Sequence, residues 1–252
     1  MQTEQLLAQL KTAIPELLGA NLVGIYLHGS YVLGGYNEAV SDLDYLIVVK
    51  KPLSPSIKQQ LMTITLTQLW PLAPAKGLEF HVLTLAATQN FQQPLPFDFH
   101  FSKYHYQHYL DNPHRYIVTM HGSDPDLAAH LMILQTAGKV LWGPAIATVF
   151  APVPATAYWD SVKFDIAAAP TQITLDPMYT ILNLCRALAY REAHLILSKQ
   201  AGGKWGLKQL PRQYWPLLRQ ALRDYQNQPG IACYPDQALH DFATMMLTRL
   251  KI

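Results

Sequence analysis

Cysteine is scarce in this chain of 252 residues. The two cysteines, Cys185 and Cys233, lie far apart and form no CxxC pair. Neither a disulfide framework nor a cysteine zinc site is therefore predicted. We expect a protein of the reducing cytoplasm.

Charged residues are also few, at 14% of the chain. The formal net charge is only +2, and no basic run or stripe of Lys and Arg between aromatic residues occurs. A nucleic-acid partner is therefore not expected. Hydrophobic residues make up 50% of the chain, which is typical of a globular protein, and the length suffices for one large or two modest domains.

Long uninterrupted apolar segments are missing as well. Residues 140–159 carry no charge, but one glycine and three prolines interrupt them, which excludes a membrane-spanning helix. We interpret this stretch as the end of one helix followed by a linker. Residues 1–5 lack the basic start and apolar core of a signal peptide, so no membrane partner is expected.

The most informative pattern is a glycine–serine pair followed by two aspartates. Gly29 and Ser30 follow an apolar, β-rich run at residues 22–27, and Asp42 and Asp44 stand at the start of a second such run. Side chains two apart on a strand share a face, so the two carboxylates offer Mg²⁺ a hard-oxygen site. The glycine lets the backbone approach a phosphate, and the serine can donate a hydrogen bond to it. The pattern predicts a nucleotidyl-transfer site.

The same His-Gly-Ser tripeptide occurs again at residues 121–123. Asp124 and Pro125 follow at once and are typical of the cap and first turn of a helix. No Asp-x-Asp strand follows this copy. We therefore assign it a structural role and reserve function for the first copy.

A third carboxylate, Glu79, precedes a β-like run at residues 80–85. If this strand lies beside that of Asp42 and Asp44, Glu79 joins the site and can accept the proton of an attacking hydroxyl. The spacing alone is equally compatible with an exposed glutamate at a strand end.

The ten histidines form no HExxH or similar metal-binding pattern. His100, His105 and His108 lie near aromatic residues, and a packed or surface role is favoured for them over a metal role.

The first half of the chain alternates between helical and strand patterns. Helices are expected at residues 3–18, from Ser54-Pro55 to about Leu69, and at about 125–142, with a proline- and aromatic-rich segment at 92–109. We therefore predict an α/β domain with a mixed sheet over residues 1–152.

The second half shows helical patterns alone. One helix is expected over residues 176–198, ended by Gly202-Gly203, another from Leu210-Pro211 through Tyr225, and a last one over 236–250. We therefore predict an all-α helical bundle over residues 153–252.

The Gly-Ser-x₁₁-Asp-x-Asp pattern resembles the nucleotidyltransferase superfamily that includes DNA polymerase β. Nearly the whole chain resembles the aminoglycoside (3″)(9) adenylyltransferases, bacterial enzymes that inactivate streptomycin or spectinomycin by adding AMP. The motifs that carry this resemblance in the second half are Leu141–Pro144, Ala151–Pro154, Leu182–Arg186, Trp205 and Leu210–Tyr214.

The resemblance implies a role for each candidate residue. Asp42 and Asp44 would bind Mg²⁺, and Glu79 would be the catalytic base. ATP would be the co-substrate, contacted by Gly29, Ser30, Ser41, Arg186, Lys199 and Tyr225. Without the resemblance, a solvated helix face for Arg186 and Lys199 and core packing for Tyr225 would be the preferred interpretation.

Departures from the family pattern bear on the substrate. Tyr104 stands where streptomycin-modifying members have a tryptophan, and Gln172 stands where they have an aspartate, although Asp176 nearby stays acidic. A neutral glutamine cannot replace the charge-assisted bond of an aspartate to a guanidinium of streptomycin, worth about 1.5–3 kcal/mol. Spectinomycin is therefore favoured over streptomycin, and an unidentified small molecule with a hydroxyl group is the alternative.

Two further functions stay open. One is a nucleotidyltransferase that adds AMP to a protein, although such proteins resemble only the first half of the chain. The other is a non-catalytic ATP-binding regulator, which would be expected to have lost one of the three carboxylates. For the favoured function we expect a monomer that binds ATP and an aminoglycoside-type small molecule.

Overall fold

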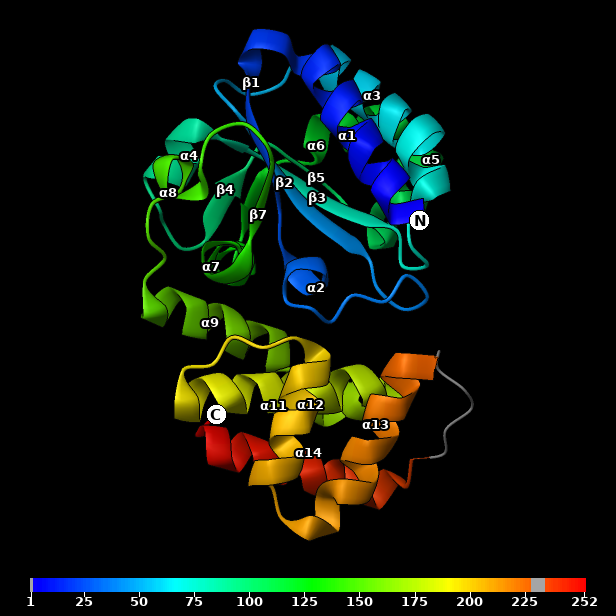
Figure 1. The fold of residues 1–252 in the computed structure, drawn as a ribbon, viewed down its shortest axis with the longest axis vertical. Coiled ribbons are helices and arrows are strands. Elements are labelled where there is room, and N and C mark those ends of the chain that lie inside the picture. The colour runs from blue at the N-terminus through cyan, green and yellow to red at the C-terminus, as the bar shows by residue number, and fades with distance from the viewer. Residues whose placement is uncertain (1, 228–233) are drawn as a thin grey trace.

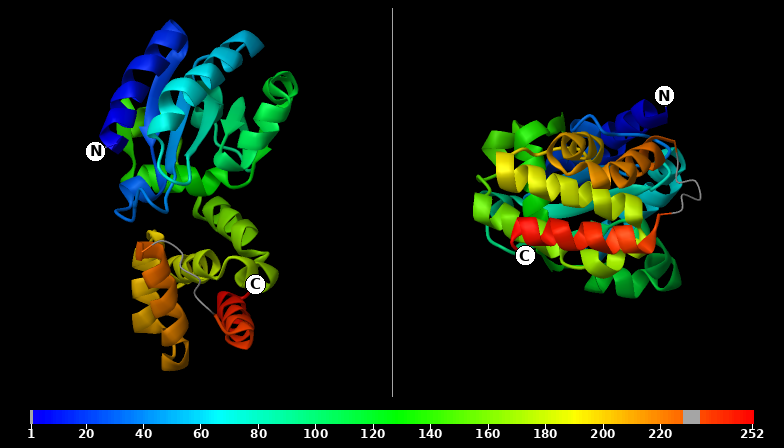
Figure 2. Two further views of the ribbon diagram at one scale, coloured as in Figure 1. Left: turned by 90° about the vertical axis from the view of Figure 1, so that its right-hand side faces the viewer. Right: turned by 90° about the horizontal axis from the view of Figure 1, so that it is seen from below.

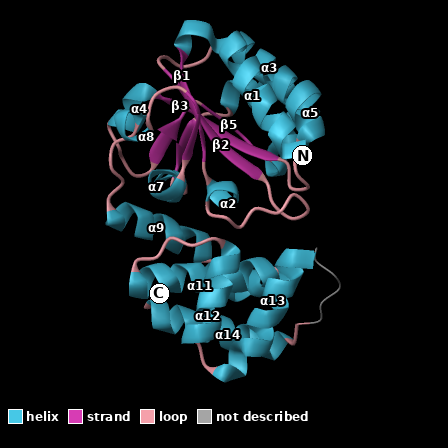
Figure 3. Ribbon diagram, in the orientation of Figure 1, coloured by secondary structure: helices cyan, strands magenta, loops and turns pink. Residues whose placement is uncertain are grey.

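The computed structural model describes residues 2–227 and 234–252, so that Cys233 lies outside the described residues. The chain forms two lobes (Figure 1). All the strands of the described residues lie in the N-terminal lobe, and the C-terminal lobe is built from helices (Figure 3). The predicted fold class, an α/β domain followed by a helical domain, is confirmed. The boundary between residues 152 and 153 stays a prediction.

A five-stranded sheet forms the centre of the N-terminal lobe. Its order is β5-β3-β2-β1-β7, and only the pair β2–β3 is parallel, so the sheet is mixed as predicted. Every residue of β2 is buried, and apart from Asp44 its side chains are β-branched, aromatic or aliphatic, as expected of a strand covered on both faces. The strands are β1 (Leu22–Leu27), β2 (Leu43–Val49), β3 (Leu78–Thr84), β5 (Phe99–Phe101) and β7 (Lys139–Trp142).

Helices cover both faces of this sheet. In Figure 1, α1, α3 and α5 lie on its right, and α4, α7 and α8 lie on its left. Each face has its own apolar core, because alternate residues of the central strands point to opposite sides. The helices are α1 (Gln2–Leu18), α2 (Gly29–Val32), α3 (Pro55–Ile64, continued by a π turn at Thr65–Leu69), α4 (Leu85–Gln89), α5 (Tyr106–Asp111), α6 (Pro113–Thr119), α7 (Leu127–Ala137) and α8 (Ile146–Val149). A separate pair of short strands consists of β4 (Leu95–Phe97) and β6 (Gly122–Asp124).

The C-terminal lobe is arranged around α11. This helix contacts α9, α10, α12, α13 and α14, and most of its residues between Met178 and Tyr190 are buried. The views of Figure 2 show the other helices packed around it. The elements are α9 (Ala155–Ile166), α10 (Ala169–Leu175), α11 (Pro177–Ala193), α12 (Lys199–Gln209), α13 (Trp215–Asn227) and α14 (Asp236–Leu250). None of the helices in the described ranges is both long and apolar enough to cross a membrane.

The helix predicted at about 125–142 is wrong at both ends. Asp124 does not cap it but lies in β6, and its carboxylate accepts a hydrogen bond from the Asp126 backbone N–H, so α7 begins at Leu127. At the other end the backbone becomes extended at Gly138. Residues 139–142, which we expected to be the end of a helix and a linker, form β7 beside β1, because valine, leucine and tryptophan suit a strand at the sheet edge.

The helix predicted over 176–198 is also shorter than expected. It ends at Ala193, after which His194 adopts the left-handed conformation with φ of 53°. Gly202 and Gly203 do not end a helix but lie buried inside α12. A Cβ atom at position 203 would lie 2.6 Å from Leu182 Cδ2, so the glycines allow α12 to pack closely on α11.

This close packing predicts an unusual result for Gly203→Ala. Alanine favours a helix over glycine by about 1 kcal/mol, yet the added methyl overlaps Leu182 and Leu222. We expect a net loss of about 1–3 kcal/mol in the free energy of unfolding, measured with urea and circular dichroism. The exposed neighbour Lys204 is the control, since Lys204→Ala should change stability by no more than about 0.5 kcal/mol. A Gly203→Ala protein as stable as the parent would contradict this packing.

Candidate active site

The three predicted carboxylates meet where the parallel strands β2 and β3 begin. Asp42 directly precedes β2, Asp44 lies in it, and the parallel register places Asp44 beside Glu79 of β3. One carboxylate oxygen from each residue lies within 4.8 Å of the others. The strand that carries Glu79 therefore pairs with the strand at Asp42 and Asp44, which was the condition for Glu79 to join the site.

Gly29 is required where β1 turns into α2. Its φ is +66°, and a Cβ atom there would lie 1.8 Å from Asp44 Oδ2. Only glycine therefore leaves room for the Asp44 carboxylate. The next residue, Ser30, lines the same cavity, and its buried hydroxyl has no hydrogen-bond partner among the described residues.

The cavity lies between the lobes, and both contribute to its walls. Arg186, Lys199 and Tyr225 of the helical lobe line it together with the three carboxylates. Lys199 begins α12, which Ser198 caps by accepting a hydrogen bond from the Ala201 backbone N–H. The Tyr225 hydroxyl donates to the Gly35 carbonyl at 2.7 Å, which fastens α13 to the loop after α2.

Most of the predicted ATP-contacting residues are thus gathered at one cavity. Ser41 differs, because it is buried and its hydroxyl accepts a hydrogen bond from the Asn37 backbone N–H at 3.1 Å. It holds the loop that leads into Asp42. Arg186 donates through Nε to the Leu197 carbonyl at 2.7 Å, which fixes its guanidinium at the cavity wall.

The electrostatics of the cavity favour a bound cation. Burial, followed by the charges of Asp42 and Glu79, raises the pKa of Asp44 well above its ordinary value. On the opposite wall, burial and the charge of Arg186 lower the pKa of Lys199, while the two aspartates oppose that shift. Clustered carboxylates facing partly buried cations are the charge pattern expected of a site for a metal–triphosphate complex.

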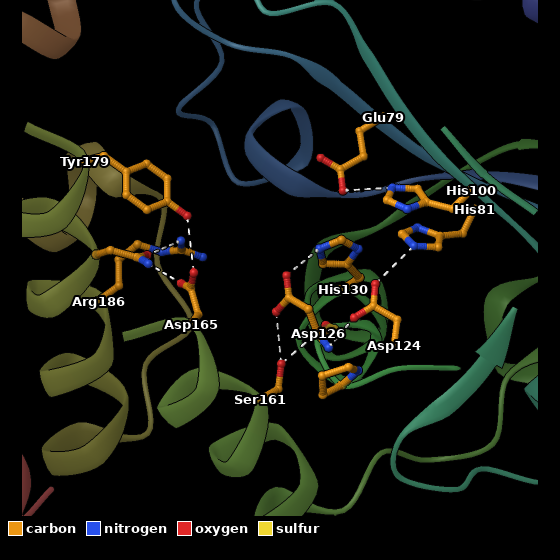
Figure 4. Close-up of polar contacts among 12 residues, drawn as sticks. Glu79, His81, His100, Asp124, Asp126, His130, Ser161, Asp165, Tyr179 and Arg186 are labelled. Carbon is orange, nitrogen blue, oxygen red and sulfur yellow. Dashed lines mark hydrogen bonds and ion pairs between the residues drawn. The ribbon is translucent and has the colours of Figure 1, made fainter. Parts of the chain in front are cut away.

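Glu79 is held in its ionised form. Burial alone would raise its pKa, but the nearby His100 and the positive charge of His130 lower it below its ordinary value. His100 Nε2 lies 3.6 Å from Glu79 Oε1 (Figure 4). An ionised carboxylate in this position can accept a proton.

The sequence patterns did not indicate His28, His81 or His130 as residues of the site. His28 directly follows β1 and lines the cavity, His81 lies two residues beyond Glu79 on β3, and His130 projects from α7 (Figure 4). Burial lowers the pKa of His81 to about 4. Burial also opposes the charged form of His130, but Asp126 and then Glu79 outweigh it and raise its pKa to about 10. No fixed spacing joins these residues, so only the sheet register and the position of α7 could identify them.

Asp126, Asp165 and Tyr179 are further cavity residues that the sequence patterns did not indicate. Asp165 accepts hydrogen bonds from the Asn183 amide and, at 3.4 Å, from the Tyr179 hydroxyl. Burial raises the pKa of Asp165 above its ordinary value. Asp126 at the start of α7 and Asp165 on α9 thus bring two further carboxyl groups to the cavity wall.

The three residues proposed for substrate specificity lie elsewhere in the structure. Tyr104 is 80% exposed, and Gln172 is exposed on α10. Asp176 caps α11, because its carboxylate accepts a hydrogen bond from the Tyr179 backbone N–H at 3.2 Å. The structure does not bring these side chains to the cavity wall, and their role in specificity stays a prediction.

Models of known protein families match both lobes of the chain. A model of the nucleotidyltransferase domain matches residues 7–93, and a model of the aminoglycoside adenylyltransferase C-terminal domain matches residues 148–249. The spectinomycin 9-adenylyltransferase of Staphylococcus aureus is 26% identical over 219 residues, which cover 85% of this chain and 82% of the relative. The aminoglycoside (3″)(9) adenylyltransferase of Escherichia coli is 23% identical over 248 residues, covering 93% and 92%.

A solved structure has the same fold over nearly its full length. The crystal structure of a spectinomycin adenyltransferase from Enterococcus faecialis, with ATP and spectinomycin, superimposes with a TM-score of 0.83 at 20% identity and covers 99% of both chains. The fold and the carboxylate site thus define a nucleotidyltransferase. The matched C-terminal domain and the relatives go further: over most of its length the chain is similar to the aminoglycoside (3″)(9) adenylyltransferases.

The tight contact at Gly29 offers a test of the site. Gly29→Ala should lower the rate of nucleotidyl transfer by about 100-fold, because the methyl group displaces the Asp44 carboxylate by about 1 Å or more. Gly34 is a matched control, since its φ is +70° and no atom lies within 4 Å of the position that a methyl group would take there. Both variants should lose similar stability through backbone strain, measured by thermal unfolding, whereas only Gly29→Ala should lose activity. Equal activities of the two variants would contradict the assignment.

Proposed function

We propose that the protein transfers AMP from ATP to a hydroxyl of an aminoglycoside-type antibiotic, with spectinomycin favoured over streptomycin. The observation that carries this proposal is one cavity in which Asp42, Asp44 and Glu79 face Arg186 and Lys199 of the other lobe. The names of the relatives support the same activity. Action as a monomer in the cytoplasm, without nucleic acid, stays a prediction from the sequence.

The residues present fit Mg²⁺. Asp42, Asp44 and Glu79 supply hard carboxylate oxygens, and burial beside two further carboxylates raises the pKa of Asp44, which a bound cation would counteract. In this proposal Asp42 and Asp44 hold the ion. When bound, Mg²⁺ would neutralise charge on the phosphate oxygens.

The residues of the chain position ATP in this scheme. The backbone at Gly29 lets a phosphate approach closely, and the unpartnered Ser30 hydroxyl can donate a hydrogen bond to it. Lys199 and Arg186 pair with the triphosphate from the helical lobe, while Tyr225 and Ser41 fix the loop beside it. The helical lobe thereby closes the cleft over the nucleotide.

Glu79 carries the proton transfer. Its carboxylate accepts the proton of the substrate hydroxyl, whose oxygen forms a bond to the α-phosphorus. The bond from the α-phosphorus to the bridging oxygen breaks at the same time, and pyrophosphate leaves with that electron pair. The negative lining of Asp126 and Asp165 suits a substrate that carries amino groups.

Two variants separate the proposed base from the proposed metal ligand. Glu79→Gln should abolish turnover but spare the binding of Mg²⁺-ATP, because glutamine cannot accept the proton. Asp44→Ala should weaken Mg²⁺-ATP binding itself. Turnover is measured as pyrophosphate release, and ATP binding by calorimetry with and without Mg²⁺.

The control for these carboxylate substitutions is Glu192→Gln, which removes a charge paired with Arg249 away from the cavity. It should change neither quantity. Full activity of Glu79→Gln would refute its role as base, and unchanged Mg²⁺-ATP affinity of Asp44→Ala would refute the metal site.

The substrate preference is tested by offering antibiotics one at a time. Pyrophosphate release from Mg²⁺-ATP is expected with spectinomycin and much less with streptomycin or a 2-deoxystreptamine aminoglycoside, because Gln172 supplies no charge for a guanidinium. Equal rates with streptomycin and spectinomycin would show that Tyr104 and Gln172 do not disfavour streptomycin. ATP binding without release for all three would point to another small molecule.

A further inference from the structure

Two histidines near Glu79 each have one ring nitrogen committed to an aspartate. His81 Nε2 lies 3.2 Å from Asp124 Oδ2, and His130 Nε2 lies 3.3 Å from Asp126 Oδ2 (Figure 4). These contacts fix the plane of each ring. They also leave the second nitrogen, Nδ1, as the free position on both side chains.

Both Nδ1 atoms are buried and have no hydrogen-bond partner within the part of the chain that the structure describes. His81 is 1% exposed, so water does not satisfy its ring from the surface. A buried polar atom without a partner is unfavourable and calls for a ligand. Histidines that bind metals show this arrangement, with one nitrogen held by a carboxylate and the other on the ion.

The third group of the cluster is the Glu79 carboxylate. One ligand atom from each of Glu79, His81 and His130 lies within 4.8 Å of the others. An ion with bonds of about 2.0–2.2 Å can reach all three after small side-chain rotations. We propose that Glu79, His81 and His130 form a second metal site, which takes a transition metal such as Zn²⁺.

The donor atoms distinguish this site from that of Asp42 and Asp44. Two imidazoles and one carboxylate suit Zn²⁺ and its neighbours, whereas a site of carboxylates alone suits Mg²⁺. Metal binding displaces any proton that the free nitrogens hold.

The aspartates behind the histidines are themselves held in place. Asp126 accepts a hydrogen bond from the Ser161 hydroxyl at 3.0 Å, and Asp124 accepts one from the Asp126 backbone N–H at 2.8 Å. The His100 ring stacks on the His81 ring with centroids 3.8 Å apart. The cluster is thus built into the fold before any ion arrives.

Glu79 is both a ligand of this metal site and the proposed catalytic base, which has a consequence for catalysis. An ion at the histidine site engages the carboxylate that is proposed to accept the substrate proton, so Zn²⁺ is expected to inhibit turnover. This consequence rests on the proposed function, whereas the binding of the metal does not.

Cobalt(II) is the probe for the site, because its visible absorption reports nitrogen ligation at low coordination number. Co²⁺ is titrated into the nucleotide-free protein in excess Mg²⁺. We expect saturation at one Co²⁺ per chain with visible bands. His81→Gln and His130→Gln should each weaken Co²⁺ binding by at least about tenfold, and Asp124→Asn, which leaves all three ligands in place, by about 10–100-fold.

The exposed His108 provides the matched control, since His108→Gln should leave the titration unchanged. Thermal unfolding of each variant shows that it is folded, and Co²⁺ should raise the unfolding temperature of the parent protein but not of His130→Gln. The absence of visible bands in the parent, or equal affinities in the parent, His130→Gln and Asp124→Asn, would overturn the proposal. Because absorption and unfolding are read without ATP, failure of adenylyl transfer would leave this result intact.

Discussion

The parallel register of β2 and β3 is the constraint on which the rest of this structure depends. It sets Asp44 beside Glu79, and the neighbouring Asp42 completes three carboxylates within 4.8 Å. Burial, and then the like charges of Asp42 and Glu79, raise the pKa of Asp44 above its ordinary value. The site therefore requires positive charge from outside the sheet.

This positive charge comes from the helical lobe and from α7. Lys199 and Arg186 face the carboxylates from the helical lobe, and His130 approaches from α7 with a pKa raised to about 10. The position of Lys199 depends on close helix packing, because Lys199 begins α12, whose buried glycines allow it to lie against α11. The second lobe thus completes an electrostatic arrangement that the sheet alone leaves unbalanced.

Local patterns in the sequence predicted the parts of the site that one strand or one turn defines. Gly29 with Ser30 and Asp42 with Asp44 were found because their spacing reflects a single turn and a period of two. The sequence patterns did not predict His81, Asp126 or His130, because these residues are brought together by the register between strands and by the packing of α7. The position of residues 139–142 was missed for a related reason: an apolar run after a helix becomes an edge strand only when a partner such as β1 is available. Tyr104 and Gln172 were placed by resemblance alone, and neither side chain reaches the cavity wall.

The destination of the α-phosphate distinguishes adenylyl transfer to an antibiotic from the alternative functions. The protein is incubated with Mg²⁺, spectinomycin and ATP labelled at the α-phosphorus, and the small molecules are then separated from the protein. We expect label on spectinomycin with the parent protein and none with Glu79→Gln. Label attached to the protein, or to a protein of an added lysate, would contradict it in favour of a protein-modifying enzyme. Bound ATP that never transfers label to spectinomycin or to any lysate component would contradict it in favour of a non-catalytic regulator.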